Sequence, residues 1–544
     1  MSKYLRRGSL LLLIAFLLVS CSKQADPSSI LDTTPEVSPT PAAVMPDVFL
    51  GNDLPKDLVD SAKLPQGWNV VNDPSKADVV LQPGQEAPIS RWVYVLVAPF
   101  PTIPDEVKFA DLENVWKNGA NADFPTTGLS VDPQTMKVLT ESMGIPDTTF
   151  IKEIPSSEIL DNAWNTNTWA IIPFEDLVPR WKVLLVDGQS PIRKGFDPTA
   201  YPLTVQFSLV SKTDNGKKSV DALGQVEKQA ILVNSNFDPG KMTILTMTGV
   251  TALVRGTAAM MELKGVTYPA IDIRDILRNA DLTHISNEVP FAVNCPPPSP
   301  DTNLQFCSKD KYIDLLKDVG TDIVEMSGDH FADWGAEAML HTLDLYQQLG
   351  WKTYGGGTNL EEAKKPLLIE NNGNKLAFLG CNAKEPGYAT AAIDNPGAWH
   401  CDWDYMSKTV RELRDQGYLP IVTFQHLEFY SYTPKAQLVT DFELMADSGA
   451  VIVSGSQAHQ PHAMEFREDA FLHYGLGNLF FDQVYEGEPE RQAFIDRHIF
   501  YNNKYINTEL IPIYFIDLAR ARPMTELERE NLLDLIFKAS GWQN

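Results

Sequence analysis

Five apolar, β-like runs in the second half of the chain are each followed by polar side chains that could carry out chemistry. The runs are 282–285 before Glu288, 323–326 before Asp329 and His330, 421–424 before His426, 451–453 before His459, and 471–474 before Asn478. In an open parallel sheet the carboxyl ends of the strands share one edge, so these side chains are expected to converge in one crevice. Carboxylates beside imidazoles suit a hard or borderline metal ion, or acid/base chemistry on a polar substrate.

The segment from Ser327 to Gly335 has the densest set of such residues. Gly328 allows close approach of a ligand, and Asp329 places a carboxylate next to the imidazole of His330. Asp333 could orient His330 or cap the helix that starts near Gly335. A single histidine on an apolar segment is usually a core residue, but histidines at three separate strand ends together with a glutamate favour a shared pocket.

The remaining histidines receive a simpler interpretation. His462 shares a loop with His459, and it either joins the pocket or lies outside it. Structural or surface roles are expected for His284, His341, His400, His473 and His498.

Length and charge limit the functional classes. With 544 residues, the chain is expected to form two domains with appendages. Its formal net charge of −26 argues against nucleic acid and against an anionic membrane surface as partners, because both favour clustered lysine and arginine.

The first residues are typical of an export signal. Lys3, Arg6 and Arg7 precede an apolar run at 10–19, which is too short to span a bilayer stably. Residues 18–21 resemble the bacterial lipobox, so we expect 1–20 to be a signal peptide and Cys21 to carry the lipid. The alternative is an ordinary cleaved signal. Residues 21–46, rich in Ser, Thr and Pro, are predicted to be a disordered tether. The protein is therefore expected outside the cytoplasm, attached to the cell membrane through the lipid anchor only.

Four further cysteines are expected to form disulfides in an oxidising compartment. Three pairings exist, and the two local ones, Cys295 with Cys307 and Cys381 with Cys401, close short loops. A zinc site built from His400 and Cys401 is the alternative, although the short Cys spacing of zinc sites is missing.

The chain divides into two α/β halves. Residues 47–236 alternate β-like runs with polar helical segments and contain no histidine, which makes this half a poor candidate for acid/base catalysis. Its segments 109–119, 170–174, 186–188 and 201–203 resemble the type II periplasmic substrate-binding fold, which implies a small-ligand module or a spacer. Residues 241–522 form the second α/β domain, and 523–544 a C-terminal helix that opens with a capping box at Thr525 and Glu528.

The second domain resembles the bacterial capsule-synthesis CapA/PgsA family, which is associated with poly-γ-glutamate capsules and related to calcineurin-like metallophosphatases. The resemblance rests on segments 248–255, 281–288, 329–335, 355–366, 425–426, 447–459 and 474–482. It implies a C-terminal metallophosphatase-like α/β domain, and together with the resemblance of residues 47–236 it gives an α/β fold with an N-terminal periplasmic-binding-like domain. It also implies that one divalent metal ion (Mn, Zn or Fe) is bound by Glu288, Asp329, His426 and His459, with His330 and Asp333 as catalytic residues. The implied partner is the capsule polymer or its synthesis machinery.

Three positions depart from the family pattern. Val250 stands where an acidic residue is expected, Gln457 where a histidine is common, and Asp329 where asparagine is usual. Valine cannot bind a metal, so the sequence predicts a partly degenerate site with one metal ion or none. The polar pocket could then bind without hydrolysing.

Three functions remain open at this point. The leading one is a surface lipoprotein that acts in the synthesis, export or attachment of a capsule polymer such as poly-γ-glutamate. The second is an exported metal-dependent phosphoesterase or related hydrolase. The third is a non-catalytic lipoprotein that binds its ligand through the N-terminal half.

Overall fold

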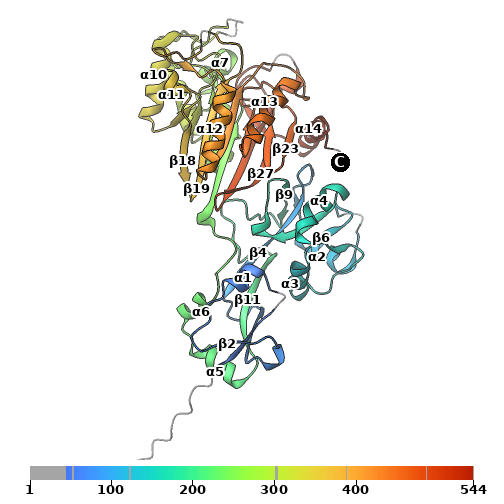
Figure 1. Ribbon diagram of the computed structural model, residues 1–544. Coiled ribbons are helices and arrows are strands. Elements are labelled where there is room, and N and C mark those ends of the chain that lie inside the picture. The colour runs from blue at the N-terminus through green and yellow to red at the C-terminus, as the bar shows by residue number, and fades with distance from the viewer. Residues whose placement is uncertain are drawn as a thin grey trace, which may run out of the picture. The chain divides into compact units, whose positions relative to one another are not determined.

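The computed structural model describes residues 45–51, 54–121, 124–299, 304–387, 389–484 and 487–542 (Figure 1). The predicted signal peptide, Cys21 and all but the last two residues of the predicted tether lie outside the described residues.

The first half of the described chain forms a mixed sheet with the strand order β2-β1-β3-β11-β4-β8-β6-β7, and β9 pairs with β4. The strands are β1 (Asp47–Leu50), β2 (Asn69–Val70), β3 (Val79–Pro83), β4 (Ser90–Pro99), β6 (Leu129–Val131), β7 (Ile151–Glu153), β8 (Trp169–Pro173), β9 (Trp181–Val183) and β11 (Thr204–Ser211). β5 (Glu106–Val107) and β10 (Leu185–Val186) form a separate pair. The helices are α1 (Lys56–Asp60), α2 (Phe109–Asn118), α3 (Pro133–Met143), α4 (Ser156–Thr166), α5 (Asp214–Ala222) and α6 (Gln225–Ile231).

Local sequence explains the central strand and one of its helices. β4 is almost continuously apolar and buried, as a strand covered on both faces should be. α3 begins where Asp132 accepts hydrogen bonds from the backbone N–H groups of Gln134 and Thr135, and Pro133 occupies the first helical position.

The second half contains two larger sheets. The first has the order β16-β15-β14-β12-β26-β27-β28, and the short β13 pairs with β14 and β25. Its strands are β12 (Met242–Thr248), β13 (Val250–Thr251), β14 (Leu282–Asn287), β15 (Ile323–Glu325), β16 (Lys352–Tyr354), β25 (Asn478–Phe480), β26 (Gln492–Tyr501), β27 (Lys504–Phe515) and β28 (Ala521–Pro523). The helices before and between these strands are α7 (Arg255–Lys264), α8 (Arg274–Arg278), α9 (Ile313–Asp318) and α10 (Gly335–Gln348).

The other sheet has the order β18-β19-β21-β22-β24-β23. It consists of β18 (Leu367–Asn371), β19 (Asn374–Asn382), β21 (Leu419–Gln425), β22 (Ile452–Ser454), β23 (Met464–Arg467) and β24 (Ala470–His473). Two glycine-containing strands, β17 (Gly356–Gly357) and β20 (Gly397–Ala398), form a small antiparallel pair, and α11 (Leu360–Ala363) follows β17. α12 (Trp403–Asp415) and α13 (Ala436–Asp447) lie side by side along this sheet (Figure 1).

Alternating side chains of this sheet enter two different cores. Phe378, Ile421 and Ile452 pack with Leu245 and other side chains of the first sheet. Their neighbours in sequence point to the opposite face and pack under α12 and α13; these are Leu379, Val422 and Val453. The two-residue period of a strand therefore gives the sheet one face for the other sheet and one for helices. The predicted α/β class is confirmed.

The expectation of one shared sheet is wrong. β14 and β15 belong to the first large sheet, whereas β21, β22 and β24 belong to the second. Apolar runs identify strands, but they do not specify which strands pair. The strand ends nevertheless meet across the two sheets, since Nε2 of Gln457 donates a hydrogen bond to Oγ of Ser286 at 2.5 Å.

Both local disulfides are confirmed. Cys295 pairs with Cys307 and Cys381 with Cys401, with Cα atoms 5.8 and 5.1 Å apart. The alternative zinc site is wrong because the sulfur of Cys401 is used in its disulfide. Two disulfides indicate an oxidising, extracytoplasmic compartment.

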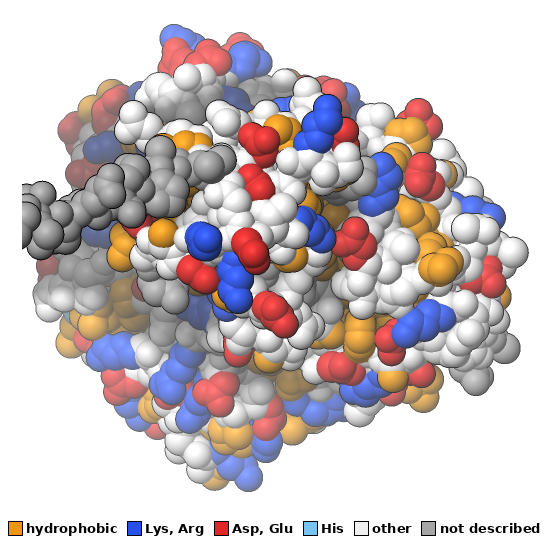
Figure 2. Space-filling model, turned by 90° about the horizontal axis from the view of Figure 1, so that it is seen from below, with side chains coloured by type: hydrophobic (Ala, Val, Ile, Leu, Met, Phe, Trp, Pro, Cys, Tyr) orange, Lys and Arg blue, Asp and Glu red, His pale blue; other side chains and the backbone are white. Residues whose placement is uncertain are grey.

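The C-terminal helix begins as the sequence predicted. α14 (Glu526–Ala539) begins with the predicted capping box of Thr525 and Glu528. Among the described residues, no helix combines the length and apolar character needed to cross a membrane. On the face that Figure 2 shows, acidic and basic side chains are interspersed.

Candidate functional site

The predicted site residues follow strands of both large sheets. Glu288 comes directly after β14, Asp329 and His330 follow β15, His426 directly follows β21, and His459 follows β22. The backbone at Gly328 lies very close to Glu288. A Cβ atom added to Gly328 would be only 2.4 Å from Cβ of Glu288. Only a residue without a side chain fits there, and this contact brings Glu288 beside the Asp329–His330 segment.

Glu288 is a buried acid, only 2% exposed. Burial raises its pKa to about 8, against the opposing charge of His330 and with a smaller increase from Asp329. The carboxyl group is therefore mostly protonated at neutral pH. In this form it can donate a hydrogen bond, whereas a metal ion requires the ionised form.

Lys384 lies at the centre of the cluster, although the sequence analysis did not single it out. Its Nζ is 2.7 Å from Oδ2 of Asp329 and 2.6 Å from Oε1 of Glu428. Burial would raise the pKa of both carboxyl groups, but Lys384 and the neighbouring histidines hold both below their ordinary values. Both acids are therefore ionised at neutral pH, and Lys384 offsets one of their two negative charges.

His330 and Asp333 form the pair that the sequence suggested. Nδ1 of His330 is 2.7 Å from Oδ2 of Asp333, whose side chain is fully buried and also accepts a hydrogen bond from the backbone N–H of Phe306. Burial would lower the pKa of His330, but the hydrogen bond to Asp333 and the charges of Glu288 and Asp329 raise it to about 9. The ring of Phe306 packs on the imidazole with centroids 4.5 Å apart. Since Phe306 precedes Cys307, the Cys295–Cys307 disulfide holds this ring near the site.

Both ring nitrogens of His426 are engaged. Nε2 is 2.9 Å from Oδ2 of Asp441 on α13, and Nδ1 accepts a hydrogen bond from the backbone N–H of Leu427. The backbone contact assigns the proton to Nε2, so Asp441 is the acceptor. His426 therefore presents no free lone pair in this arrangement.

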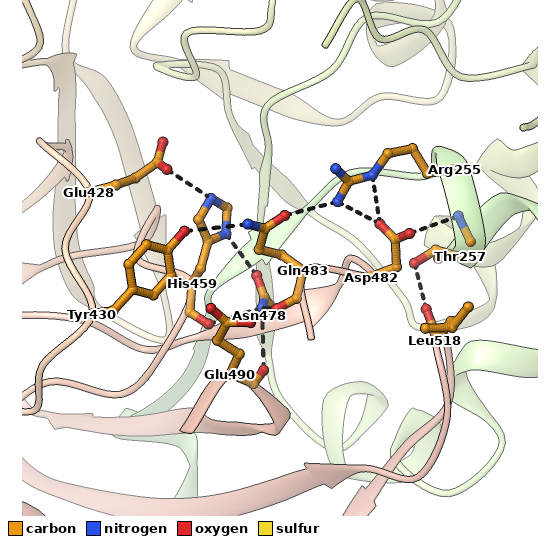
Figure 3. Close-up of polar contacts among 11 residues, drawn as sticks. Arg255, Thr257, Glu428, Tyr430, His459, Asn478, Asp482, Gln483, Glu490 and Leu518 are labelled. Carbon is orange, nitrogen blue, oxygen red and sulfur yellow. Dashed lines mark hydrogen bonds and ion pairs between the residues drawn. The ribbon is translucent and has the colours of Figure 1, made fainter. Parts of the chain in front are cut away.

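His459 has one nitrogen free of hydrogen bonds. Nδ1 donates to Oδ1 of Asn478 at 3.0 Å, which fixes the ring, and Nε2 lies 3.8 Å from Oε2 of Glu428. Figure 3 shows His459 between Glu428 and Asn478. Burial lowers the pKa of His459 more than Glu428 raises it, so the ring is neutral at physiological pH.

A second polar chain, drawn in Figure 3, supports the site from the side of α7. The guanidinium group of Arg255 binds Oδ1 of Asp482 through two nitrogens, at 3.0 and 2.8 Å, and Oε1 of Gln483 at 3.0 Å. It also lies over the rings of Phe306 and Phe481. Arg255 thus braces two aromatic rings, of which Phe306 packs on His330 and Phe481 on His459.

A narrow pocket opens beside His459, with a volume of about 20 Å³, which is room for about one water molecule. His426, Glu428, Gln457, His459 and His462 contribute to its wall. His462 therefore joins the pocket, but its ring stacks on Phe429 with centroids 4.1 Å apart. Burial lowers its pKa to about 4, which leaves it neutral.

The sequence analysis missed one further acid below the site. Glu325 is fully buried on β15 and accepts hydrogen bonds from the hydroxyl groups of Ser327 and Ser456. Its Oε2 is 3.9 Å from Nε2 of His284, which is 2.7 Å from the hydroxyl of Tyr354. Burial raises the pKa of Glu325. These contacts join the two large sheets, and the structural role expected of His284 agrees with them.

A signal for Lys384 and Glu428 was present in the sequence. The apolar run 376–379 precedes Lys384 just as the five named runs precede their polar residues, and Glu428 is two residues from His426. Lysine was not considered because the expected chemistry was that of metal ligands.

The described donor atoms fit a divalent metal poorly. Among the residues that the structure describes, no three His, Cys, Asp or Glu side chains are grouped to hold a metal ion. Glu288 holds its proton, His426 uses both nitrogens, and the ammonium group of Lys384 lies against the two ionised acids. The poor fit rests on the engaged nitrogens of His426 and on the position of Lys384, because a metal ion that bound would displace the proton of Glu288. The predicted metal ion, its ligands and the catalytic roles of His330 and Asp333 stay predictions.

Known proteins show similarity to the second half of the chain in particular. Residues 244–483 match the family model of the bacterial capsule synthesis protein PGA_cap. The capsule biosynthesis protein CapA of Bacillus anthracis is 22% identical over 293 residues, which cover 53% of this chain and 71% of that protein.

Two solved structures resemble parts of the fold. An ABC-type phosphate transport receptor from Vibrio cholerae has 12% identity and a TM-score of 0.24, covering 29% of this chain and 78% of that one. A 5'-nucleotidase precursor from Thermus thermophilus has 12% identity and a TM-score of 0.29, covering 56% and 60%. At such scores neither structure carries an argument about function.

Proposed function

We propose that the protein acts in the synthesis, export or attachment of an extracellular capsule polymer such as poly-γ-glutamate, because residues 244–483 match the family model of the bacterial capsule synthesis protein. The family match carries this proposal. It encloses every strand-end residue of the candidate site, including Lys384 and Glu428, which the sequence analysis had not predicted. The proposal includes attachment to the cell surface through a lipid on Cys21, and the polymer or its synthesis machinery as partner.

Two features of the candidate site support a polar ligand. The pocket beside His459 is lined mainly by apolar and aromatic side chains, among which imidazole, carboxylate and amide groups can hydrogen-bond a polar group. The charges of the neighbouring site are already engaged within the protein, so a ligand need not compensate them. A site of this kind can hold one polar group of a polymer chain without cleaving the chain.

The test is deletion of the gene in the bacterium that carries it. The washed cells are expected to lose most of their bound polymer, measured as glutamate released by acid hydrolysis, and the wild-type gene should restore it. A Cys21→Ser gene should yield protein that leaves the membrane fraction and should restore little polymer. Normal polymer in the deletion strain would contradict the proposal.

A second candidate is an exported hydrolase, which the His330–Asp333 pair favours. An imidazole held by a buried carboxylate at 2.7 Å is an arrangement that general acid/base catalysis uses. The purified protein would be assayed on a chromogenic phosphodiester and on poly-γ-glutamate, with His330→Ala as the test variant and His341→Ala as the control. Turnover that His330→Ala leaves unchanged does not arise from this site and removes the candidate.

A further inference from the structure

Backbone hydrogen bonds hold the segment around Lys384 in place independently of the contacts of its side chain. Oδ1 of Asn382 accepts a hydrogen bond from the backbone N–H of Lys384 at 2.9 Å. The N–H of Ala383 donates to the carbonyl of Gln425 at the end of β21. The Cys381–Cys401 disulfide anchors the end of β19 directly before this turn. Lys384 is thus a positioned residue rather than a surface lysine that happens to find a partner.

Its ammonium group joins the ends of three strands from both large sheets. Asp329 follows β15, Glu428 follows β21, and Lys384 follows β19. The contacts of 2.7 and 2.6 Å are those of strong charge-assisted hydrogen bonds. The Lys384 side chain is 19% exposed, so water screens these contacts only in part. The other oxygen of Glu428 faces Nε2 of His459 at 3.8 Å, which places Lys384 within the cluster of predicted metal ligands.

A divalent ion at this place would need the same carboxylate groups. It would have to displace the ammonium group from both acids or stay beside it, and like charges at such short range repel because water screens them only in part. Two other features point the same way. Val250 is fully buried and offers no donor atom, and both nitrogens of His426 are engaged.

We propose that the ammonium group of Lys384 is the resident cation of this site and takes the place of the divalent metal ion that the metallophosphatase resemblance implies. A lysine supplies one positive charge and three hydrogen-bond donors on a flexible stem, which is held here by the two ion pairs. It holds the ends of β15, β19 and β21 together, as a shared metal ion would, and it needs no metal supply outside the cell.

The test is metal binding by the purified full-length protein. The wild type and the Lys384→Met variant are treated with chelator, incubated with Mn²⁺, Zn²⁺ or Fe²⁺, desalted and analysed by elemental mass spectrometry, and Mn²⁺ affinity is measured by calorimetry. We expect substoichiometric metal in the wild type. Lys384→Met frees Asp329, Glu428 and His459, and should bind Mn²⁺ at least about tenfold more tightly.

Two further variants serve as controls. Lys384→Arg keeps the positive charge and should resemble the wild type. Lys364→Met removes a lysine that pairs with Glu361 at 2.7 Å on the surface, and it should gain no metal affinity.

Stoichiometric metal in the wild type would overturn the proposal, and so would a folded Lys384→Met protein that binds Mn²⁺ no better than the wild type. If Lys384→Met does not fold, the melting temperature of the wild type decides. It should be the same in chelator and in Mn²⁺ on the order of 1 mM, because a ligand that does not bind cannot stabilise, and a rise with Mn²⁺ would overturn the proposal. These measurements need no capsule polymer, so their outcome is independent of the proposed function.

Discussion

At the scale of single residues, the charges near the strand ends are engaged within the protein, in two pairs and one group of three. Asp333 binds His330, Asp482 binds Arg255, and Lys384 binds Asp329 and Glu428. Removing one member of such a pair leaves an uncompensated buried group, which costs more free energy than the pair itself contributes.

Asp333 provides the clearest case. Asp333→Ala removes the acceptor of two hydrogen bonds, from His330 and from the backbone of Phe306, and should lower the free energy of unfolding by about 2–3 kcal/mol. Asp333→Asn keeps one acceptor oxygen, so its free energy of unfolding should fall by less. Urea unfolding measures both, with Asp344→Ala on the exposed side of α10 as the control. Equal stability of Asp333→Ala and the control would contradict the pairing.

The stability of the protein should depend on pH because of Glu175, in the first half of the chain. Burial raises its pKa from the ordinary value of 4.5 to about 7, although Trp92 and Asn236 donate hydrogen bonds to it. The folded state binds the proton more tightly than the unfolded chain does. The resulting stability is present in full below about pH 4.5 and is lost as the pH rises through about 7.

The glutamine in the Glu175→Gln variant cannot ionise, so the variant should not lose this stability as the pH rises. Between about pH 4.5 and pH 8 the wild type should lose up to about 3 kcal/mol more stability than the variant. Chemical unfolding at the two pH values measures the difference, and Glu86→Gln, at an exposed position, should behave like the wild type. Parallel pH profiles for the wild type and Glu175→Gln would exclude a raised pKa.

The sequence could predict which residues follow strands, but not how they pair. Apolar runs before Glu288, Asp329 and His459 were sufficient to find the strand ends. The partner of His426 is Asp441, on a helix in the next connection, and the partner of Asp329 is Lys384, far along the chain. Such contacts depend on the tertiary fold and leave no periodic signal in the sequence.

At the scale of elements, close approach of β14 and β15 depends on Gly328. In Gly328→Ala the new Cβ would meet Cβ and Cα of Glu288 at 2.4 and 2.5 Å, so the backbone must move. We expect a loss of about 2–3 kcal/mol in unfolding free energy. In the control Gly387→Ala the nearest atom is 3.8 Å away, and the change should stay within about 0.5 kcal/mol. A Gly328→Ala protein as stable as this control would show that the two strand ends are further apart.

The five strands were predicted correctly and their sheet was not, for a physical reason. Side chains such as Ile421 and Val422 are both apolar because each face of β21 is covered, one by the other sheet and one by helices. A continuous apolar run reports that both faces are buried, but it does not report whether a helix or a second sheet covers them. The local disulfides and the α14 capping box were predictable because their residues are near one another in sequence.

At the scale of the whole molecule, the net charge of −26 determines how a polyanionic polymer can approach. Repulsion extends over about 30 Å at 0.01 M salt and about 8 Å at 0.15 M salt. If the proposed polymer binds through short-range hydrogen bonds in the pocket beside His459, this repulsion hinders binding most at low salt. A basic protein shows the opposite dependence, because its attraction to the polymer weakens as salt is added.

We therefore expect the association of the purified protein with poly-γ-glutamate to strengthen as salt rises from about 0.01 to about 0.15 M. Interferometry on immobilised polymer measures the change, and a neutral polysaccharide serves as the control surface. The pocket has its own test: His459→Ala should weaken binding at the higher salt without altering the direction of the salt dependence. Binding that is strongest at low salt would mean that a local basic surface, rather than this pocket, contacts the polymer.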